Sequence, residues 1–214
     1  MRGLVTGIAL ALLLAACTGP SWGSNDRSWL RGAPRDAAPG RAFGPVPLST
    51  PYVQARREGD GLLVTNSAIG SGISPLPFLG EAPRRLVWEV RAEILREGMD
   101  GGWGLEFGAT SDGAYRALVY ASGRFCVDRA FGEYPEFIHC VTRQPSLRPG
   151  ESGNVLGLEV DGPRVTVRVN GDVAVTFEDE RLVPGGLALA VAGAGAQVLF
   201  RGGELREPPA GSPP

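Results

Sequence analysis

The chain has 214 residues, with 21 basic and 23 acidic side chains and a formal net charge of −2. All the basic residues are arginines, so a Schiff-base lysine and a phosphate-binding Walker lysine are both excluded. A single histidine cannot build a multi-histidine metal site, and the near-neutral charge gives nucleic-acid binding no electrostatic basis. The length fits one domain of ordinary size with tails, and 32 glycines and 18 prolines indicate many turns.

The N-terminus has the features of an export signal. Arg2 precedes an apolar run from Leu4 to Ala16, which is too short for a transmembrane helix. The small residues before Cys17 resemble the lipobox of bacterial lipoproteins, in which the cysteine is acylated and becomes the new N-terminus. The alternative is an ordinary secretory signal with an incidental cysteine. The lipoprotein interpretation predicts a signal peptide over 1–16, lipidation of Cys17 and attachment to a lipid bilayer.

The residue after the cysteine bears on location. Thr18 stands where an aspartate would indicate retention in the inner membrane, by resemblance to Gram-negative sorting. The expected location is therefore the bacterial cell envelope, with the protein anchored in the outer membrane and facing the periplasm.

Composition divides the rest of the chain into three parts. Residues 17–47 are rich in Gly, Pro, Ser, Arg and Asp without periodicity, which predicts a flexible tether about 30 Å long. Residues 48–206 have the pattern of a folded domain, and residues 207–214 form a Pro-rich tail with no structural pattern.

The domain has the period-two alternation of apolar and polar residues that is typical of half-buried strands. The segment from Leu86 to Ile94 is one example, and Asn170-Gly171 and Asp161-Gly162 are turn signals between later alternating segments. No stretch has helical spacing. The sequence therefore predicts an all-β fold, an antiparallel β-sandwich of roughly 11 or 12 strands.

Hairpin geometry predicts the register of the central strands. A three-residue loop at 121–123 pairs Leu118 with Cys126, and the tip of the next hairpin, near residues 132–135, places Cys126 opposite Cys140. In an exported chain these two cysteines are expected to form a disulfide, which would stabilise the fold by about 3 kcal/mol. The alternative is two buried free thiols.

The same register assigns the side chains of these strands to two faces. His139 lies on the core face beside Val127, where a partly buried structural histidine is expected in preference to a catalytic base. The face predicted to pack in the core holds Tyr115, Ala117, Val119, Phe125, Val127, Phe137 and Val141.

Seven segments of the domain together carry a family resemblance: 88–93, 102–107, 112–115, 122–125, 154–160, 169–171 and 186–189. They resemble the concanavalin A-like (laminin-G-like) jelly-roll family, and in particular the bacterial branch with 3-keto-disaccharide hydrolase-like domains. The resemblance covers roughly residues 50 to 206, and it implies two antiparallel sheets, one of them often concave and used to bind glycans or proteins.

The outward face of the central strands is the candidate ligand-binding site. Arginine forks and carboxylates can hydrogen-bond sugar hydroxyls, and a tyrosine ring can stack on a sugar. Gly104 and Gly108 are expected to leave room above the sheet, and Trp103 and Tyr134 to extend the site or cover an edge. The alternative is a salt-bridged solvent face that pairs Arg116 with Asp128 and Tyr120 with Arg124. The candidate residues are Glu106, Arg116, Tyr120, Arg124, Asp128 and Trp103.

Paired catalytic carboxylates are not evident. The spacing in Glu178-Asp179-Glu180 differs from the glucanase pattern of this family, and Glu89 and Glu93 would stand about 13 Å apart on one strand. Asp100 and Asp112 lie in Asp-Gly turns that could lend carboxylates to Ca²⁺; otherwise no cofactor is expected.

The sequence thus favours a membrane-anchored, non-catalytic binding module for a carbohydrate or an envelope partner. One alternative is a glycosidic-bond hydrolase or lyase of the 3-keto-disaccharide hydrolase type. Another is a structural lipoprotein of an envelope assembly with no small ligand.

Overall fold

The computed structural model describes residues 52–68, 72–131, 134–148 and 153–208, and within these ranges the protein is all β, with no helix. The predicted signal peptide, Cys17, the tether and most of the predicted C-terminal tail lie outside the described residues. None of the described segments could cross a membrane as a long apolar helix.

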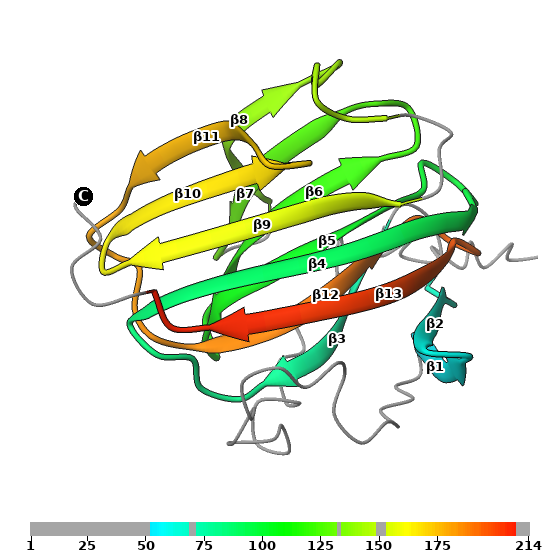
Figure 1. Cartoon of the computed structure of the whole chain (residues 1–214), viewed down its shortest axis with the longest axis horizontal. Coiled ribbons are helices and arrows are strands. Elements are labelled where there is room, and N and C mark those ends of the chain that lie inside the picture. Colours follow the sequence, from blue (N-terminus) through cyan, green and yellow to red (C-terminus); the bar gives the residue numbers. More distant parts are fainter. Residues whose placement is uncertain (1–51, 69–71, 132–133, 149–152, 209–214) are drawn as a thin grey trace, which may run out of the picture.

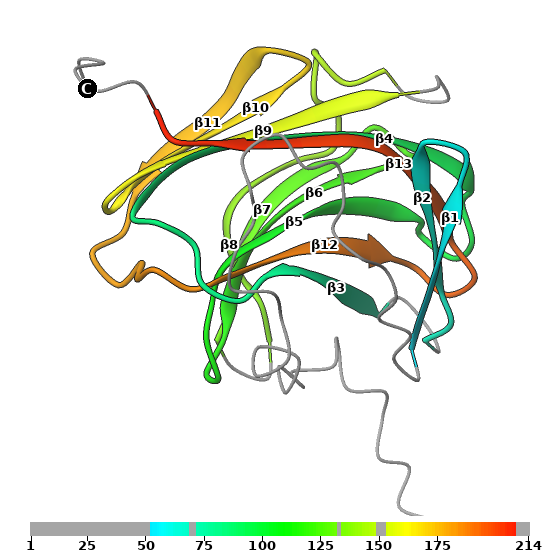
Figure 2. The same cartoon turned by 60° about the horizontal axis from the view of Figure 1, so that its bottom comes forward.

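In the part of the chain that the structure describes, thirteen strands form two antiparallel sheets that stack as two layers (Figures 1 and 2). The seven-stranded sheet has the order β1 (Val53–Glu58), β2 (Gly61–Asn66), β13 (Gln197–Arg206), β4 (Arg85–Arg96), β9 (Asn154–Asp161), β10 (Arg164–Val169) and β11 (Asp172–Glu178). The six-stranded sheet has the order β3 (Ile73–Leu79), β12 (Gly186–Ala192), β5 (Gly102–Ala109), β6 (Ala114–Tyr120), β7 (Phe125–Ala130) and β8 (Glu136–Val141). The predicted antiparallel sandwich is confirmed, with slightly more strands than expected.

The main core lies between the two sheets, because each strand turns alternate apolar side chains toward the other layer. On β4, Trp88 is fully buried and stacks on Phe78 at 5.0 Å between ring centroids. On β5, Trp103 is only 1% exposed and meets Phe200 of β13 edge to face at 5.8 Å. Its prediction as a ligand-binding residue is therefore wrong, since it faces the core.

The predicted register of β6, β7 and β8 is confirmed over most of its length. Leu118 pairs with Cys126, Cys126 with Cys140 and Val127 with His139. The Cys126–Cys140 disulfide is present, with the two Cα atoms 4.1 Å apart. His139 is half-buried, with its ring centroid 5.9 Å from that of Phe125, as expected for a structural histidine.

The register changes at one point, where β8 contains a bulge. Val127 pairs with His139 but the next residue, Asp128, pairs with Phe137, so Ile138 is the extra residue and packs partly on the core. Phe137 is 60% exposed on the opposite side. The prediction that Phe137 lies in the core is wrong, because the bulge reverses its direction.

Candidate functional site

The outer face of the six-stranded sheet presents three rows of side chains that run across neighbouring strands. Paired residues of antiparallel strands point to the same side, so the pairings define each row. The charged row is Ala188, Glu106, Arg116, Asp128 and Phe137; the disulfide row is Ala190, Gly104, Leu118, Cys126 and Cys140; the tyrosine row is Ala192, Gly102, Tyr120 and Arg124.

The charged row contains a buried ion pair. Arg116 Nε donates to Asp128 Oδ1 at 2.7 Å, and the two side chains are only 7% and 3% exposed. Glu106, on the other side of Arg116, is 2% exposed. Burial raises the pKa of the Asp128 carboxyl, and the guanidinium of Arg116 partly opposes this rise. The predicted pairing of Arg116 with Asp128 is confirmed, but its expected exposure to solvent is wrong.

The disulfide and tyrosine rows beside this pair are also closed to solvent. The side chains of Leu118 and Tyr120 lie over the glycines of β5, so that a Cβ on Gly104 would come within 2.8 Å of Leu118 Cδ2 and one on Gly102 within 2.9 Å of Tyr120 Cδ1. The expected room above Gly104 is thus filled by a neighbouring side chain. A second, smaller apolar cluster results, made of Leu118, Tyr120, Cys126, Ala190 and Ala192.

The tyrosine row ends in a cation–π contact. The guanidinium carbon of Arg124 lies 3.8 Å from the ring centroid of Tyr120, and Arg124 Nη2 donates to Asp100 Oδ2 at 2.7 Å. Burial raises the pKa of the Tyr120 hydroxyl. The Nε of Arg124 is buried and has no hydrogen-bond partner in the part of the chain that the structure describes. Such an unpaired buried donor is costly in a folded protein.

Gly108 and Tyr134 do not belong to these rows. Gly108 has a φ of +57°, and a Cβ there would meet Leu182 Cδ1 at 2.7 Å, so it belongs to a different part of the molecule. Tyr134 precedes β8 and is 68% exposed. Phe137 is the residue that sequence reasoning missed: the bulge brings this exposed ring to the end of the charged row, beside Asp128.

Two of the acidic residues considered for catalysis, Asp179 and Glu93, are bound to protein groups. Asp179 Oδ2 accepts hydrogen bonds from Tyr115 Oη at 2.9 Å and from Arg129 Nη1 at 2.7 Å. Its side chain is 10% exposed, so it ties the β11–β12 connection to β6 and β7. Burial and the bond to Asp179 raise the pKa of Tyr115. Glu93 lies 3.4 Å from Arg201 on the seven-stranded sheet.

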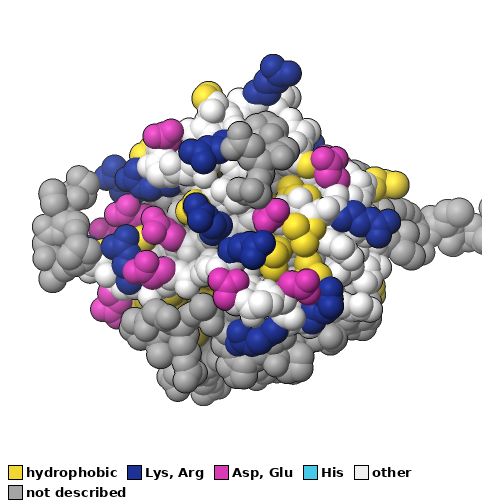
Figure 3. Space-filling view, turned by 45° about the vertical axis from the view of Figure 1, so that its right-hand side comes forward, with side chains coloured by type: hydrophobic (Ala, Val, Ile, Leu, Met, Phe, Trp, Pro, Cys, Tyr) yellow, Lys and Arg dark blue, Asp and Glu magenta, His cyan; other side chains and the backbone are white. Residues whose placement is uncertain are grey.

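The two aspartates considered for Ca²⁺ also interact with protein groups, Asp100 with Arg124 and Asp112 with Ser111. Among the described residues, no three His, Cys, Asp or Glu side chains gather closely enough to hold a metal ion. In the face shown in Figure 3, acidic and basic side chains are intermixed rather than segregated by sign.

The two antiparallel layers of the described residues and their register define a jelly-roll β-sandwich. Comparison with solved structures shows the same concanavalin A-like, galectin-like fold. No protein-family model matches the chain, and no curated protein matches it either.

The similar structures share little sequence with this chain. The carbohydrate-binding module CBM66 from Bacillus subtilis is 14% identical at a TM-score of 0.57, over 72% of this chain and 92% of that one. A Bacillus subtilis protein of unknown function with a galectin-like fold is 12% identical at 0.55, over 72% and 87%. The alginate lyase AlgAT5, of polysaccharide lyase family 7, is 12% identical at 0.52, over 75% and 84%. At this level of identity the similarity concerns the fold.

Proposed function

We propose that the domain is a carbohydrate-binding module that recognises its ligand across β6, β7 and β8 on the outer face of the six-stranded sheet. The observation that carries this proposal is the placement of an exposed aromatic ring, that of Phe137, and a partly exposed guanidinium, that of Arg124, on either side of the disulfide row.

The two ends of this surface supply complementary interactions. The Phe137 ring offers an apolar plane on which the C–H face of a sugar ring stacks. The guanidinium of Arg124, 34% exposed and held by Tyr120 and Asp100, donates to a sugar oxygen. The buried Arg116–Asp128 pair lies beneath the ligand and fixes β6 against β7, so that the contacting groups are held in place before binding.

Binding is favoured over hydrolysis by the arrangement of the carboxylates. Glu106 and Asp128 are the acidic residues of the charged row, and β6 separates their strands, which places their backbones about 10 Å apart. Glycosidases hold the two carboxyl groups about 5 to 9.5 Å apart and accessible to the substrate. Here one carboxylate is tied to Arg116 and both are buried. The fold shared with the alginate lyase makes a glycosidic-bond hydrolase or lyase the second candidate.

The location forms a separate part of the proposal. Acylation of Cys17 would anchor the domain in the cell envelope, with residues 17–47 as a spacer, where it would meet a glycan or another envelope component. Expression of the Cys17→Ser variant tests this part: the protein should move from the membrane fraction to the soluble fraction. Retention of the variant in the membrane would contradict the anchor.

A glycan-array screen of the soluble Cys17→Ser chain tests the binding function. We expect one glycan class to bind, and Phe137→Ala and Arg124→Gln each to weaken that binding about tenfold, which corresponds to a loss of about 1.4 kcal/mol. Arg85→Gln, on the outer face of the other sheet, is the matched control and should bind normally. Binding unaffected by both site variants would overturn the assignment of the surface, and turnover of a glycan would establish the enzyme instead.

A further inference from the structure

The outer face of the six-stranded sheet is closed to solvent over β12 and β5, although its side chains there are small. Ala188, Ala190 and Ala192 of β12 alternate with core residues, so they point outward, and they are at most 1% exposed. Across the sheet, Ala190 lies between Pro75 of β3 and Gly104 of β5. The outer face of an antiparallel sheet is commonly solvated, and residues this small do not shield one another from water. Something further covers this part of the face.

The larger and charged side chains of the same face are buried as well. Leu118 fills the space over Gly104, yet it is itself 0% exposed. In the charged row, Glu106 is 2%, Arg116 6% and Asp128 2% exposed. Charged side chains are almost never this deeply buried on a face that water reaches. The cover therefore extends from β12 across β5 and β6 to β7.

None of the strands within the described ranges supplies this cover. They contact one another within a sheet or across the main core, and Figure 2 shows them in two layers, without a third. On the outer face of the seven-stranded sheet, by contrast, Val155 and Thr166 are partly exposed, as expected for a face in water. Of the five stretches outside the described ranges, four have six residues or fewer, and the fifth comprises residues 1–51.

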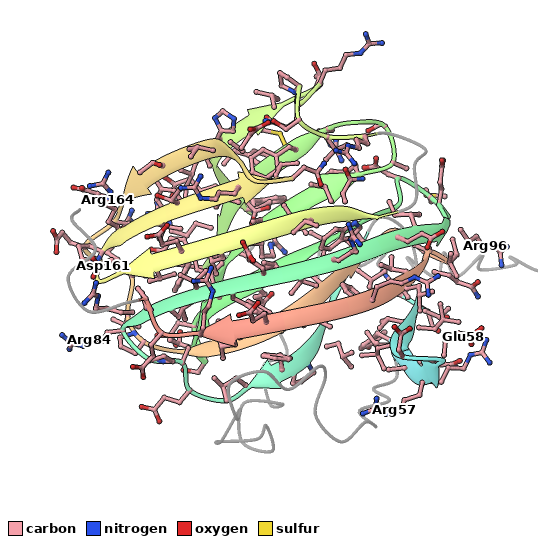
Figure 4. All side chains as sticks on the ribbon, viewed as in Figure 1. Arg57, Glu58, Arg84, Arg96, Asp161 and Arg164 are labelled. Atoms are coloured by element: carbon pink, nitrogen blue, oxygen red, sulfur yellow. A yellow bond between two sulfur atoms is a disulfide. The ribbon has the colours of Figure 1, made fainter. Side chains whose placement is uncertain are left out.

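The chain enters the domain beside an edge of this face. β1 begins at Val53 and contacts β3, the edge strand of the six-stranded sheet. It lies at the lower right of Figure 4, where Arg57 and Glu58 are labelled. Six strands at a spacing of about 4.8 Å span about 24 Å, a distance that about eight extended residues can cross. The residues that precede β1 can thus reach every strand of the face.

The sequence before β1 has a composition that complements the face. Residues 27–48 contain four arginines and one aspartate, whereas the charged row has two carboxylates and one guanidinium. The same residues include Trp29, Leu30 and Phe43, large apolar side chains that suit a floor of alanine and glycine. Both charge and hydrophobicity therefore favour this segment as the cover.

We propose that residues 27–48, the N-terminal strap, dock in extended form across the outer face of the six-stranded sheet. The apolar side chains of the strap cover β12 and β5, its arginines face the carboxylates of the charged row, and residues 17–26 remain as the free spacer. The strap also covers part of the surface assigned to the glycan. In this respect, which rests on the proposed function, strap and glycan compete for the same rows.

Labelling of engineered cysteines with iodoacetamide, in the full Cys17→Ser chain, tests the docking. Ala190→Cys should react slowly, because the strap covers this position. Three serine replacements made together release the strap: Trp29→Ser, Leu30→Ser and Phe43→Ser. They should speed the labelling of position 190 at least about tenfold, since the covered state is then less populated. Thr166→Cys, on the partly exposed outer face of the other sheet, is the matched control and should label at the same rate with either strap.

The outcomes that overturn the docking are distinct. Ala192→Cys provides a second probe if Ala190→Cys does not fold. Fast labelling at these positions in the intact chain, or a slow rate that the serine replacements leave unchanged, would contradict the strap. Protection that depends on protein concentration would instead assign the cover to a second copy of the chain.

Glycan binding is a separate measurement. The glycan array repeated with the triple serine variant should show about tenfold tighter binding of the same glycan class, because the glycan no longer has to displace the strap. Faster labelling with unchanged glycan affinity would support the docking and contradict the placement of the glycan on these rows. Unchanged labelling overturns the strap, whatever the glycan affinity.

Discussion

The outer faces of the two sheets contain similar ion pairs in very different surroundings. On the seven-stranded sheet Arg85 lies 2.9 Å from Asp161, and the side chains are 44% and 46% exposed. On the six-stranded sheet Arg116 lies 2.7 Å from Asp128, and the side chains are 7% and 3% exposed. The distances are nearly equal, so geometry alone does not distinguish these pairs, and burial decides how much each affects stability.

The difference arises from the neighbouring strands. Beside Arg116, the adjacent rows are occupied by glycines and alanines of β5 and β12, over which Leu118 and Tyr120 lie, and water is displaced. Beside Arg85, the outer positions of β4 and β9 include charged residues, with Glu159 opposite Val87 and Glu89 opposite Gly157. An alternating sequence therefore gives a solvated face or a second apolar cluster, depending on what the adjacent strands supply.

Removal of one partner of the buried pair should have the largest effect. Arg116→Met should lower the free energy of unfolding by about 3–5 kcal/mol, because Asp128 is left buried without a countercharge. Urea denaturation of the variant and the wild type measures the difference.

The double variant provides the control for this prediction. Arg116→Met combined with Asp128→Leu should recover the part of the loss that comes from the uncompensated Asp128 carboxylate, since an apolar pair fits beside the cluster around Leu118, while Glu106 stays buried next to position 116. A single variant as stable as the wild type would contradict the burial of the pair.

Much of this architecture is predictable from the sequence, and the residues show why. The short loop at 121–123 predicts the pairing of β6 with β7. Cys126 and Cys140 are equally distant from the tip of the β7–β8 hairpin, which predicts that they pair with each other. The inward direction of Trp103 also follows from the alternation along a strand, because it lies two residues before Leu105 on β5 and both side chains are buried in the core.

Other features depend on contacts between distant segments. The bulge at Ile138 leaves no local signal, and the reversal of Phe137 follows from it. The alanines of β12 that extend the rows lie far along the chain, and their place beside β5 is known only from the sheet order. Sequence reasoning thus predicted the rows of the candidate site but not their exposure.

Loss of the disulfide should have the next largest effect. The Cys126→Ala, Cys140→Ala double variant should lose about 3 kcal/mol of stability, because the loop between these residues is no longer closed in the unfolded chain. Differential scanning calorimetry with and without reductant measures this loss. The reduced wild type should melt at the same temperature as the double variant. A wild-type melting temperature that does not change on reduction would contradict the prediction.

The buried pair should also make stability depend on pH in a defined direction. The pKa of Asp128 is raised above its ordinary value of 3.8 by burial, and loss of Arg116 removes the opposing charge and raises it further. A carboxyl whose pKa is raised in the folded protein stabilises the fold at pH values below its ordinary pKa. This stabilisation is lost as the pH rises through the pKa that the carboxyl has in the folded protein.

The deficit of Arg116→Met relative to the wild type should therefore shrink as the pH falls from 7 toward about 4, by about 1.4 kcal/mol for each unit of pKa shift. In the wild type, protonation of Asp128 instead leaves Arg116 without its partner. Urea titrations at several pH values measure the free energy of unfolding of the wild type and of the variant. A deficit that stays constant or grows on acidification would show that the Asp128 carboxylate is not the group responsible.

The exposed pair should give the smallest effect. Arg85→Gln should change the free energy of unfolding by less than about 1 kcal/mol, because water screens the charges and the two flexible side chains lose entropy when they pair. That small change should fall further in high salt, while the loss caused by Arg116→Met should be nearly independent of salt, since ions do not reach a buried pair. Measurement of the free energy of unfolding of both variants at low and high ionic strength compares the two faces directly. Equal salt dependence would mean that solvent reaches both pairs, and the distinction between the two faces would then be wrong.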